Sequence, residues 1–159
     1  MSFAHSENSR GQKHELTTHL QEVAKLTSEF AKEFGAAELG HWAGLWHDLG
    51  KFHPDFQAYL SKPTAARGPD HKGAGAVIAG RYAEPLAFLV AGHHGGLKDR
   101  EDLKVWLHDR ASEPRTQEAL RVAQAEFPSI APPSALSLPP WLRSKTDVEF
   151  FLRMLFGAH

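Results

Sequence analysis

Apolar side chains recur at helical spacing through the first part of the chain. Between Glu15 and Phe34 they stand three, four or seven positions apart, and Gly35 follows where a helix commonly ends. We therefore predict an amphipathic helix over residues 15–34 with one face turned toward a core. The apolar positions that define this face are Leu16, Leu20, Val23, Phe30 and Phe34.

The segment from Ala36 to Leu49 is apolar on most of its sides rather than along a single stripe. A helix of this kind belongs at the centre of a bundle. Trp42 and Trp46 lie four positions apart within it, and we expect them to pack in the core rather than stack on nucleic-acid bases. The pattern predicts a central helix over residues 36–49 that ends at Gly50.

Proline and glycine divide the rest of the chain into further helical segments. Pro54 and Pro85 each fit the first turn of a helix, and the small residues of HKGAGAVIAG would allow a neighbouring backbone to come close. The proline-rich segment 127–141 predicts a long connection. No alternating strand pattern is present, so the predicted fold class is all-α, a helical bundle. The remaining helices are predicted over residues 54–60, 71–82, 85–94, 99–111, 115–127 and 146–156.

The composition narrows the class of protein. A chain of 159 residues predicts one domain, over residues 1–159, and its formal net charge of −1 gives no general attraction to phosphate. The chain has no cysteine, which excludes disulfides, thiolate metal sites and cysteine nucleophiles in this chain. No signal-peptide pattern or membrane-length apolar run is found, so we expect a soluble cytoplasmic protein without a membrane partner.

Histidine is the residue type that stands out, with 11 in the chain. Several lie at the ends of predicted helices, where a bundle can converge them on one interior metal site. Imidazole and carboxylate together suit Mn, Fe, Co, Ni or Zn, whereas Mg prefers more oxygen ligands. The candidate metal ligands, contributed by four predicted helices, are His19, His47, Asp48, His71, His93 and His94.

Asp48 has a particular place among these candidates because a carboxylate has two oxygens. It could bind one metal ion with each oxygen, and the histidines would then divide between the two ions. Two such ions can activate a water and stabilise the attacking and leaving oxygens of a phosphodiester. Each candidate also has an interpretation without a metal. His47 and Asp48 could form a hydrogen bond that caps the helix end. His71, His93 and His94 could be polar residues of a helix terminus or loop.

Four short motifs carry a resemblance to a known family. WHDLGK, preceded by THLQEVAKL and followed by DHKGAGA and AGHHGGL, resembles the HD-domain superfamily of metal-dependent phosphohydrolases. It is more closely similar to the HD nuclease domain of the CRISPR-associated helicase-nuclease of type I systems, which FAHSENS and FQAYL also match. The resemblance runs over residues 3–97 and touches the tail only in FFLRMLF.

The resemblance implies roles for individual residues. Asp48 would bridge two metal ions, and Lys51 matches a lysine for which the family suggests a role near the scissile phosphate, which makes both catalytic candidates. The first ion would be bound by His19, His47 and Asp48, and the second by Asp48, His71, His93 and His94.

The implied activity is metal-dependent cleavage of single-stranded DNA in CRISPR interference and antiviral defence, with one or two divalent ions such as Mn, Ni, Co or Fe, or else Mg or Zn. The implied partners are single-stranded DNA, a superfamily 2 helicase domain or subunit, and the CRISPR surveillance complex. The chain itself has no GxxxxGK[ST] phosphate loop.

In the family, the helix that resembles FFLRMLF continues into an acidic segment whose aspartate completes the first metal site. This chain ends at GAH, and His159 lies near the corresponding point. Two alternative functions stay open: an HD phosphohydrolase acting on nucleotides or phosphomonoesters, and an incomplete HD module that serves as a scaffold.

The remaining histidines and a short basic segment lack such a pattern. We expect the histidines at the surface or as hydrogen-bonding neighbours of the site, and the basic residues on a mixed solvated face. The histidines are His5, His14, His41, His53 and His108, and the basic residues are Lys98, Arg100 and Lys104.

Overall fold

The computed structural model describes residues 1–62, 68–96, 99–132 and 134–156. Within these ranges the chain is all-α, as predicted, and the only β-type pairing is an isolated bridge between Phe3 and Glu15. None of the described helices combines the length and apolar composition that crossing a membrane requires. The elements are α1 (Leu16–Lys32), α2 (Ala37–Trp46), the 3-10 helix η1 (Leu49–Phe52), α3 (Pro54–Ser61), α4 (Lys72–Tyr82), α5 (Glu84–Gly92), α6 (Arg100–Ser112), α7 (Pro114–Glu126) and α8 (Lys145–Phe156).

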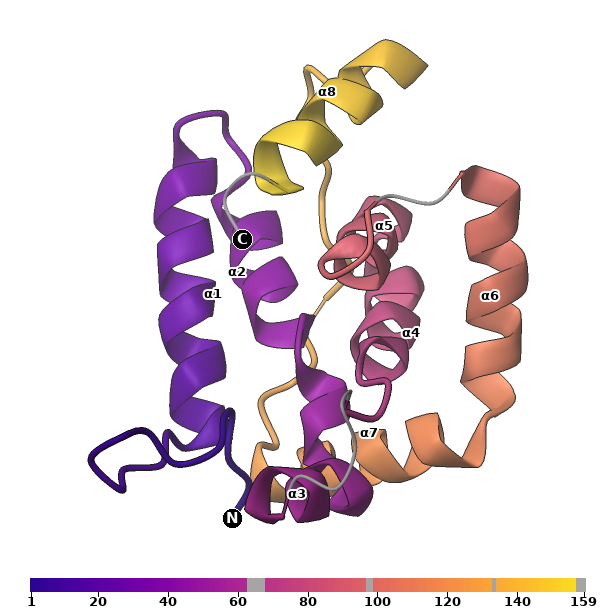
Figure 1. The fold of residues 1–159 in the computed structure, drawn as a ribbon. Helices are drawn as coiled ribbons and strands as arrows, with labels where there is room; N and C mark the ends of the chain where they lie inside the picture. Colours follow the sequence, from indigo (N-terminus) through magenta and orange to yellow (C-terminus); the bar gives the residue numbers. More distant parts are fainter. Residues whose placement is uncertain (63–67, 97–98, 133, 157–159) are drawn as a thin grey trace.

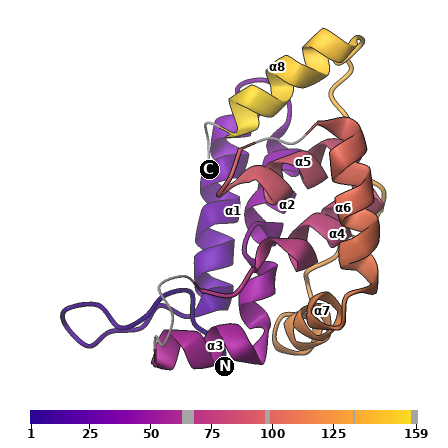
Figure 2. The ribbon, with the colours of Figure 1, turned by 45° about the vertical axis from the view of Figure 1, so that its right-hand side comes forward.

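The helices form a bundle with α2, α4 and α5 at its centre (Figure 1). α1 runs beside α2, and α6 lies along the opposite side of α4. After the turn shown in Figure 2, α6 still lies beside α4, while α3 and α7 stay together at one end. The short helix η1 contacts α3, α4 and α7, so the segment after α2 lies where several elements meet.

α1 packs against α2 through small side chains. A Cβ added to Gly40 would lie 2.7 Å from Cβ of Ala31, so only glycine allows this approach. The hydroxyl of Thr27 donates to the Gly40 carbonyl at 2.6 Å. Phe30, which the periodicity placed on the buried face, is 48% exposed. That part of the prediction is wrong because the buried face of α1 consists of Leu16, Leu20, Ala24, Thr27 and Ala31.

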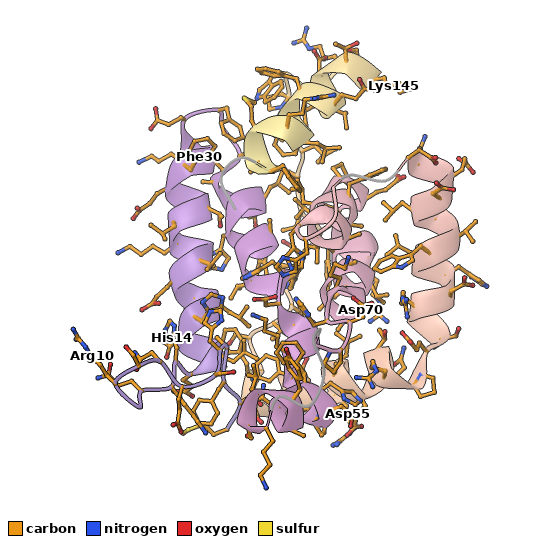
Figure 3. All side chains as sticks on the ribbon, in the orientation of Figure 1. Arg10, His14, Phe30, Asp55, Asp70 and Lys145 are labelled. Carbon is orange, nitrogen blue, oxygen red and sulfur yellow. The ribbon has the colours of Figure 1, made fainter. Side chains whose placement is uncertain are left out.

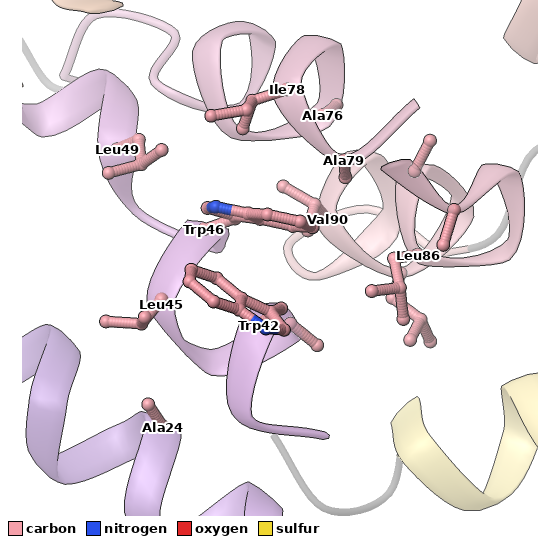
Figure 4. Close-up of a cluster of buried hydrophobic side chains, with 14 of the residues drawn as sticks. Ala24, Trp42, Leu45, Trp46, Leu49, Ala76, Ile78, Ala79, Leu86 and Val90 are labelled. Carbon is pink, nitrogen blue, oxygen red and sulfur yellow. The ribbon is translucent and has the colours of Figure 1, made fainter. Parts of the chain in front are cut away.

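The central core surrounds two tryptophans of α2 (Figure 4). Trp46 is fully buried and Trp42 nearly so, which confirms that they pack in the core. The Trp46 ring stacks on Tyr82 with centroids 5.8 Å apart. Its Nε1 donates to the carbonyl of Ile130 at 2.7 Å, within the predicted connection between α7 and α8. This connection therefore packs into the core.

α2 ends earlier than the sequence predicts. Its last residue is Trp46, and His47 is the C-cap with helical dihedrals. Asp48 leaves the helical conformation at φ −117° and ψ 17°, after which η1 begins. The predicted end at Gly50 is thus wrong, and the change of direction falls within the His47–Asp48 pair itself.

Candidate metal centre

Four histidines surround the carboxylate of Asp48. The Nε2 atoms of His19 and His47 lie 3.5 and 3.1 Å from Oδ2 of Asp48. The Nε2 atoms of His71 and His93 lie 3.4 and 3.5 Å from Oδ1. Each carboxylate oxygen therefore faces its own pair of imidazoles, and Asp48 itself is only 3% exposed.

The side chains form two potential ligand groups that share Asp48. Within each group, one ligand atom from every residue lies within 4.8 Å of the others. The structure thus brings together all six side chains that the sequence singled out, in the same division. One group is His19, His47 and Asp48, and the other is Asp48, His71, His93 and His94.

Helix ends position most of these side chains. His47 is the C-cap of α2, His71 the N-cap of α4 and His93 the C-cap of α5, whereas His19 comes from within α1. A Cβ on Gly50 would overlap the carbonyl of His71 and lie 2.5 Å from its Cα. The glycine of the HDLGK motif is therefore what allows the start of α4 to approach the end of α2.

Backbone carbonyls orient the imidazole rings. Nδ1 of His47 and of His93 lies 2.6 and 2.7 Å from the carbonyl of the residue three positions earlier. Nδ1 of His71 lies 3.3 Å from the carbonyl two positions earlier. Because a carbonyl can only accept, each Nδ1 carries a proton and donates it, which leaves Nε2 as the metal-binding atom of a neutral ring. This is the tautomer that binds a metal through Nε2.

Several of the converging atoms are left without a hydrogen-bond partner. Within the described part of the chain, these buried atoms are Nε2 of His19, His71 and His93 and Oδ1 of Asp48. Buried polar atoms are rarely unpaired, and lone pairs that face one another repel unless a cation lies between them. Ligand atoms about 2.1 Å from a shared ion lie roughly 3.0–3.4 Å apart in octahedral or tetrahedral geometry. The Nε2–carboxylate separations of 3.1 to 3.5 Å are close to this range.

Electrostatics favour the metal-binding protonation states. Burial alone would raise the pKa of Asp48, but contacts with the surrounding imidazoles outweigh it and hold this pKa well below the ordinary value. Burial lowers the pKa of His71. Burial and the neighbouring His93 and His71 rings lower the pKa of His94 to about 4. At neutral pH Asp48 is therefore a carboxylate, and His71 and His94 are neutral imidazoles.

Lys51 is buried against the same carboxylate. Its Nζ lies 2.7 Å from Oδ2 of Asp48 and donates to the carbonyl of Ala4 at 3.1 Å. The residue is only 6% exposed. Lys51 therefore ties the N-terminal segment to Asp48, and its predicted role beside a scissile phosphate stays a prediction.

The other histidines lie around the centre or away from it. The rings of His5 and His14 lie edge-on to His19, with centroids 5.3 and 5.5 Å away. Nε2 of His14 also lies 3.2 Å from a carboxylate oxygen of Glu22, and His14 lies near the start of α1 (Figure 3). His53 accepts a backbone hydrogen bond that begins α3. His159 and Lys98, which the sequence also singled out, fall outside the described residues.

A pocket of about 560 Å³ lies beside the second ligand group, and two of that group, His71 and His94, line it. Sequence reasoning did not identify this pocket, because its walls come from segments far apart in the chain. Its other lining residues are Phe56, Tyr59, Gly68, Pro69, Asp70, Lys72, Trp106 and Arg110.

Comparison with known families gives one match. The family model described as HD domain matches residues 16–126, from the start of α1 to the end of α7. This span covers more than half of the 159 residues and contains both ligand groups. No curated protein matches the chain.

Proposed function

Because the chain belongs to the HD-domain family of metal-dependent hydrolases, we propose that it hydrolyses phosphodiester bonds of single-stranded DNA with metal-activated water. The observation that carries most weight is the pair of ligand groups that meet at Asp48. A carboxylate shared in this way would hold two ions close together, as phosphodiester hydrolysis by two metals requires.

The residues of the centre have distinct parts in this reaction. Bound divalent ions would lower the pKa of a water ligand and offset the charge of the phosphate oxygens. Asp48 would contribute one oxygen to each ion. The Nδ1 hydrogen bonds of His47 and His93 fix their rings with Nε2 toward Asp48, so these atoms would serve as ligands of the ions. Imidazole-rich groups of this kind favour Mn, Fe, Co or Ni over Mg, with Zn also suited.

Lys51 has a positioning role in this scheme. Its ammonium group neutralises the buried carboxylate and fixes the position of Oδ2. A direct contact with the scissile phosphate, as the sequence resemblance implies, would require Nζ to leave Asp48.

The sequence resemblance extends this proposal to biological context. The motifs FAHSENS, WHDLGK and FQAYL support a role in CRISPR interference and antiviral defence in the cytoplasm. In that setting a superfamily 2 helicase, fused or separate, would supply the single strand at a CRISPR surveillance complex.

A second candidate is hydrolysis of nucleotides or other phosphomonoesters. It uses the same metal chemistry, and the pocket of about 560 Å³ beside His71 and His94 favours it because this volume suits a small ligand.

The two activities can be separated in one assay. Metal-stripped protein is incubated with single-stranded DNA, duplex DNA and a nucleotide panel, each with Mn, Co, Ni, Fe, Mg or Zn added in turn. We expect cleavage of single-stranded DNA with at least one transition metal. Hydrolysis of nucleotides alone would instead support the second candidate.

Two variants control this assay. Asp48→Asn keeps the shape of the side chain but removes its charge, and it should abolish activity because both ligand groups use this carboxylate. Asp109→Asn changes an exposed carboxylate on α6 and should behave like the wild type. If no DNA is cleaved with any metal, the nuclease function is refuted, and a folded scaffold becomes the better account.

A further inference from the structure

The pocket beside the second ligand group borders the candidate reaction centre directly. His71 and His94 line both the pocket and this group. Trp106 and Arg110 of α6 also line it, and α6 lies alongside α4 in both orientations (Figures 1 and 2). A molecule in the pocket would therefore lie next to an ion bound by this group.

Aromatic rings form much of the pocket wall. Phe56 is buried and lies edge-on to His71, with centroids 5.0 Å apart. Tyr59 and Trp106 are half-buried, and they line the pocket from α3 and α6. Tyr59 packs closely on Gly68, where an added Cβ would lie 2.8 Å from the ring. Aromatic side chains bind nucleobases by stacking, largely independently of sequence.

Two cations line the pocket, and they differ in their partners. Arg110 donates to both carboxylate oxygens of Glu113 at 2.8 and 2.7 Å, and its guanidinium lies 5.4 Å from the Trp106 ring centroid. Lys72, by contrast, forms no ion pair through Nζ among the described residues. A Cβ on Gly95 would lie 3.7 Å from this Nζ, so the ammonium group lies next to the turn that follows His94. Lys72 is thus placed for a phosphate near the ligand group.

Asp70 adds a negative charge on another part of the wall. Its carboxylate lies 3.7 Å from Nη2 of Arg110, at the start of α4 (Figure 3). A phosphate would be repelled there, whereas the amino group of a base could donate to this carboxylate. The charges therefore favour a phosphate near Lys72 and His94 and a base nearer Asp70 and Trp106.

On the basis of the function proposed above, we propose that this pocket binds the base of the nucleotide whose phosphate lies at the ligand group. Trp106 and Tyr59 stack on the base, and Lys72 contacts the phosphate. The volume of about 560 Å³ is in the range of small-molecule sites. The ligand class is a nucleoside phosphate, supplied either by a single strand or by a free nucleotide.

Binding to metal-free protein tests this subsite without any catalysis. A fluorescein-labelled single-stranded oligodeoxynucleotide is titrated with wild-type protein in EDTA, and anisotropy is recorded. Trp106→Leu and Tyr59→Leu should each weaken binding about fivefold or more, the effect of losing one stacked base. Lys72→Gln should also weaken binding and reduce the slope of log Kd against log salt by about 1.

Matched variants away from the pocket serve as controls. Phe150→Leu changes an exposed aromatic side chain on α8, and Lys25→Gln an exposed lysine on α1. Both should bind the oligonucleotide like the wild type. Circular dichroism and thermal melting identify any variant that fails to fold. If Trp106→Leu fails to fold, Tyr59→Leu still tests the stacking.

An oligonucleotide with abasic residues separates base recognition from phosphate binding. Wild-type protein should bind it several-fold more weakly, whereas Trp106→Leu should show little further loss. Displacement of the labelled strand by deoxynucleoside monophosphates would identify free nucleotides as the ligand source, and failure to displace it would identify the strand.

The outcomes distinguish this subsite from the proposed function. Three results would overturn the subsite even if DNA is cleaved. The first is that both stacking variants bind the oligonucleotide like the wild type, and the second is that the wild type binds abasic and ordinary DNA with equal affinity. The third is that neither the oligonucleotide nor the deoxynucleoside monophosphates bind. Base-dependent binding without cleavage under any metal would keep the subsite and refute the nuclease function.

Discussion

Gly50→Ala tests how closely the end of α2 and the start of α4 must approach to build the centre. The φ angle of Gly50 is not positive, so alanine is allowed conformationally and its cost is steric. The new Cβ would overlap the carbonyl of His71 and lie 2.5 Å from its Cα, whereas ordinary contact begins at 3.4 Å. The segments must therefore separate by more than 0.9 Å (3.4 minus 2.5), because the carbonyl lies nearer than the Cα. Overpacking of this size costs about 1–3 kcal/mol.

The same displacement moves His71 away from Asp48, whose Oδ1 now lies 3.4 Å from Nε2 of His71. We expect the affinity of the second ligand group for Mn²⁺ to fall roughly 10-fold or more, by analogy with the loss of groups that orient metal ligands. Isothermal titration calorimetry with Mn²⁺ measures this affinity, and urea unfolding in EDTA measures the stability.

Gly80→Ala is the matched control. Gly80 is exposed on α4, and its added Cβ would meet nothing closer than Leu107 Cδ1 at 3.6 Å. This variant should bind Mn²⁺ like the wild type and be as stable or slightly more so. Wild-type Mn²⁺ affinity in a folded Gly50→Ala variant would refute the reasoning, because the close approach would then not position His71.

Three further predictions concern stability. Thr27→Val removes a buried hydrogen bond to α2 and should lower the free energy of unfolding in urea by about 1–3 kcal/mol, whereas Thr18→Val, at an exposed position, should change it little. Trp46→Phe leaves a buried carbonyl without its donor and should cost a similar amount, about 1–3 kcal/mol, in the same assay; an unchanged value would show that water replaces the donor. In EDTA, the free energy of unfolding should fall as the pH decreases from 6.5 toward 4. Folding lowers the pKa of His71 and lowers the pKa of His94 to about 4. The unfolded chain therefore binds protons at a higher pH than the folded chain, which favours unfolding. His94→Gln should flatten this pH dependence, and an unchanged slope would contradict the assigned cause.

Motifs and helix periodicity predicted the fold class, and the side chains that the motifs singled out lie together in the structure. His47, Asp48, His71 and His93 occur at helix ends, where polar side chains interrupt apolar runs, and this signal is visible in the sequence. The motifs shared with HD domains imply the same two groups of residues, and the family match covers this region.

Features that depend on contacts between helices were less predictable. The buried face of α1 is marked by small residues such as Ala24 and Thr27, which a search for large apolar side chains passes over. They face Gly40 and Gly44 of α2. This fit between small residues of two helices cannot be read from either helix alone. The pocket is another example, since Tyr59 and Trp106 belong to different helices and neither residue alone indicates a site.

The number of Mn²⁺ ions bound per chain tests the central claim most directly. Equilibrium dialysis followed by elemental analysis, at neutral pH, gives this number for the wild type and for Asp48→Asn. Since both ligand groups include Asp48, we predict two ions per wild-type chain and loss of both in a folded Asp48→Asn variant. Unchanged binding in that variant would show that Asp48 does not join the two groups, and would contradict the proposed metal centre.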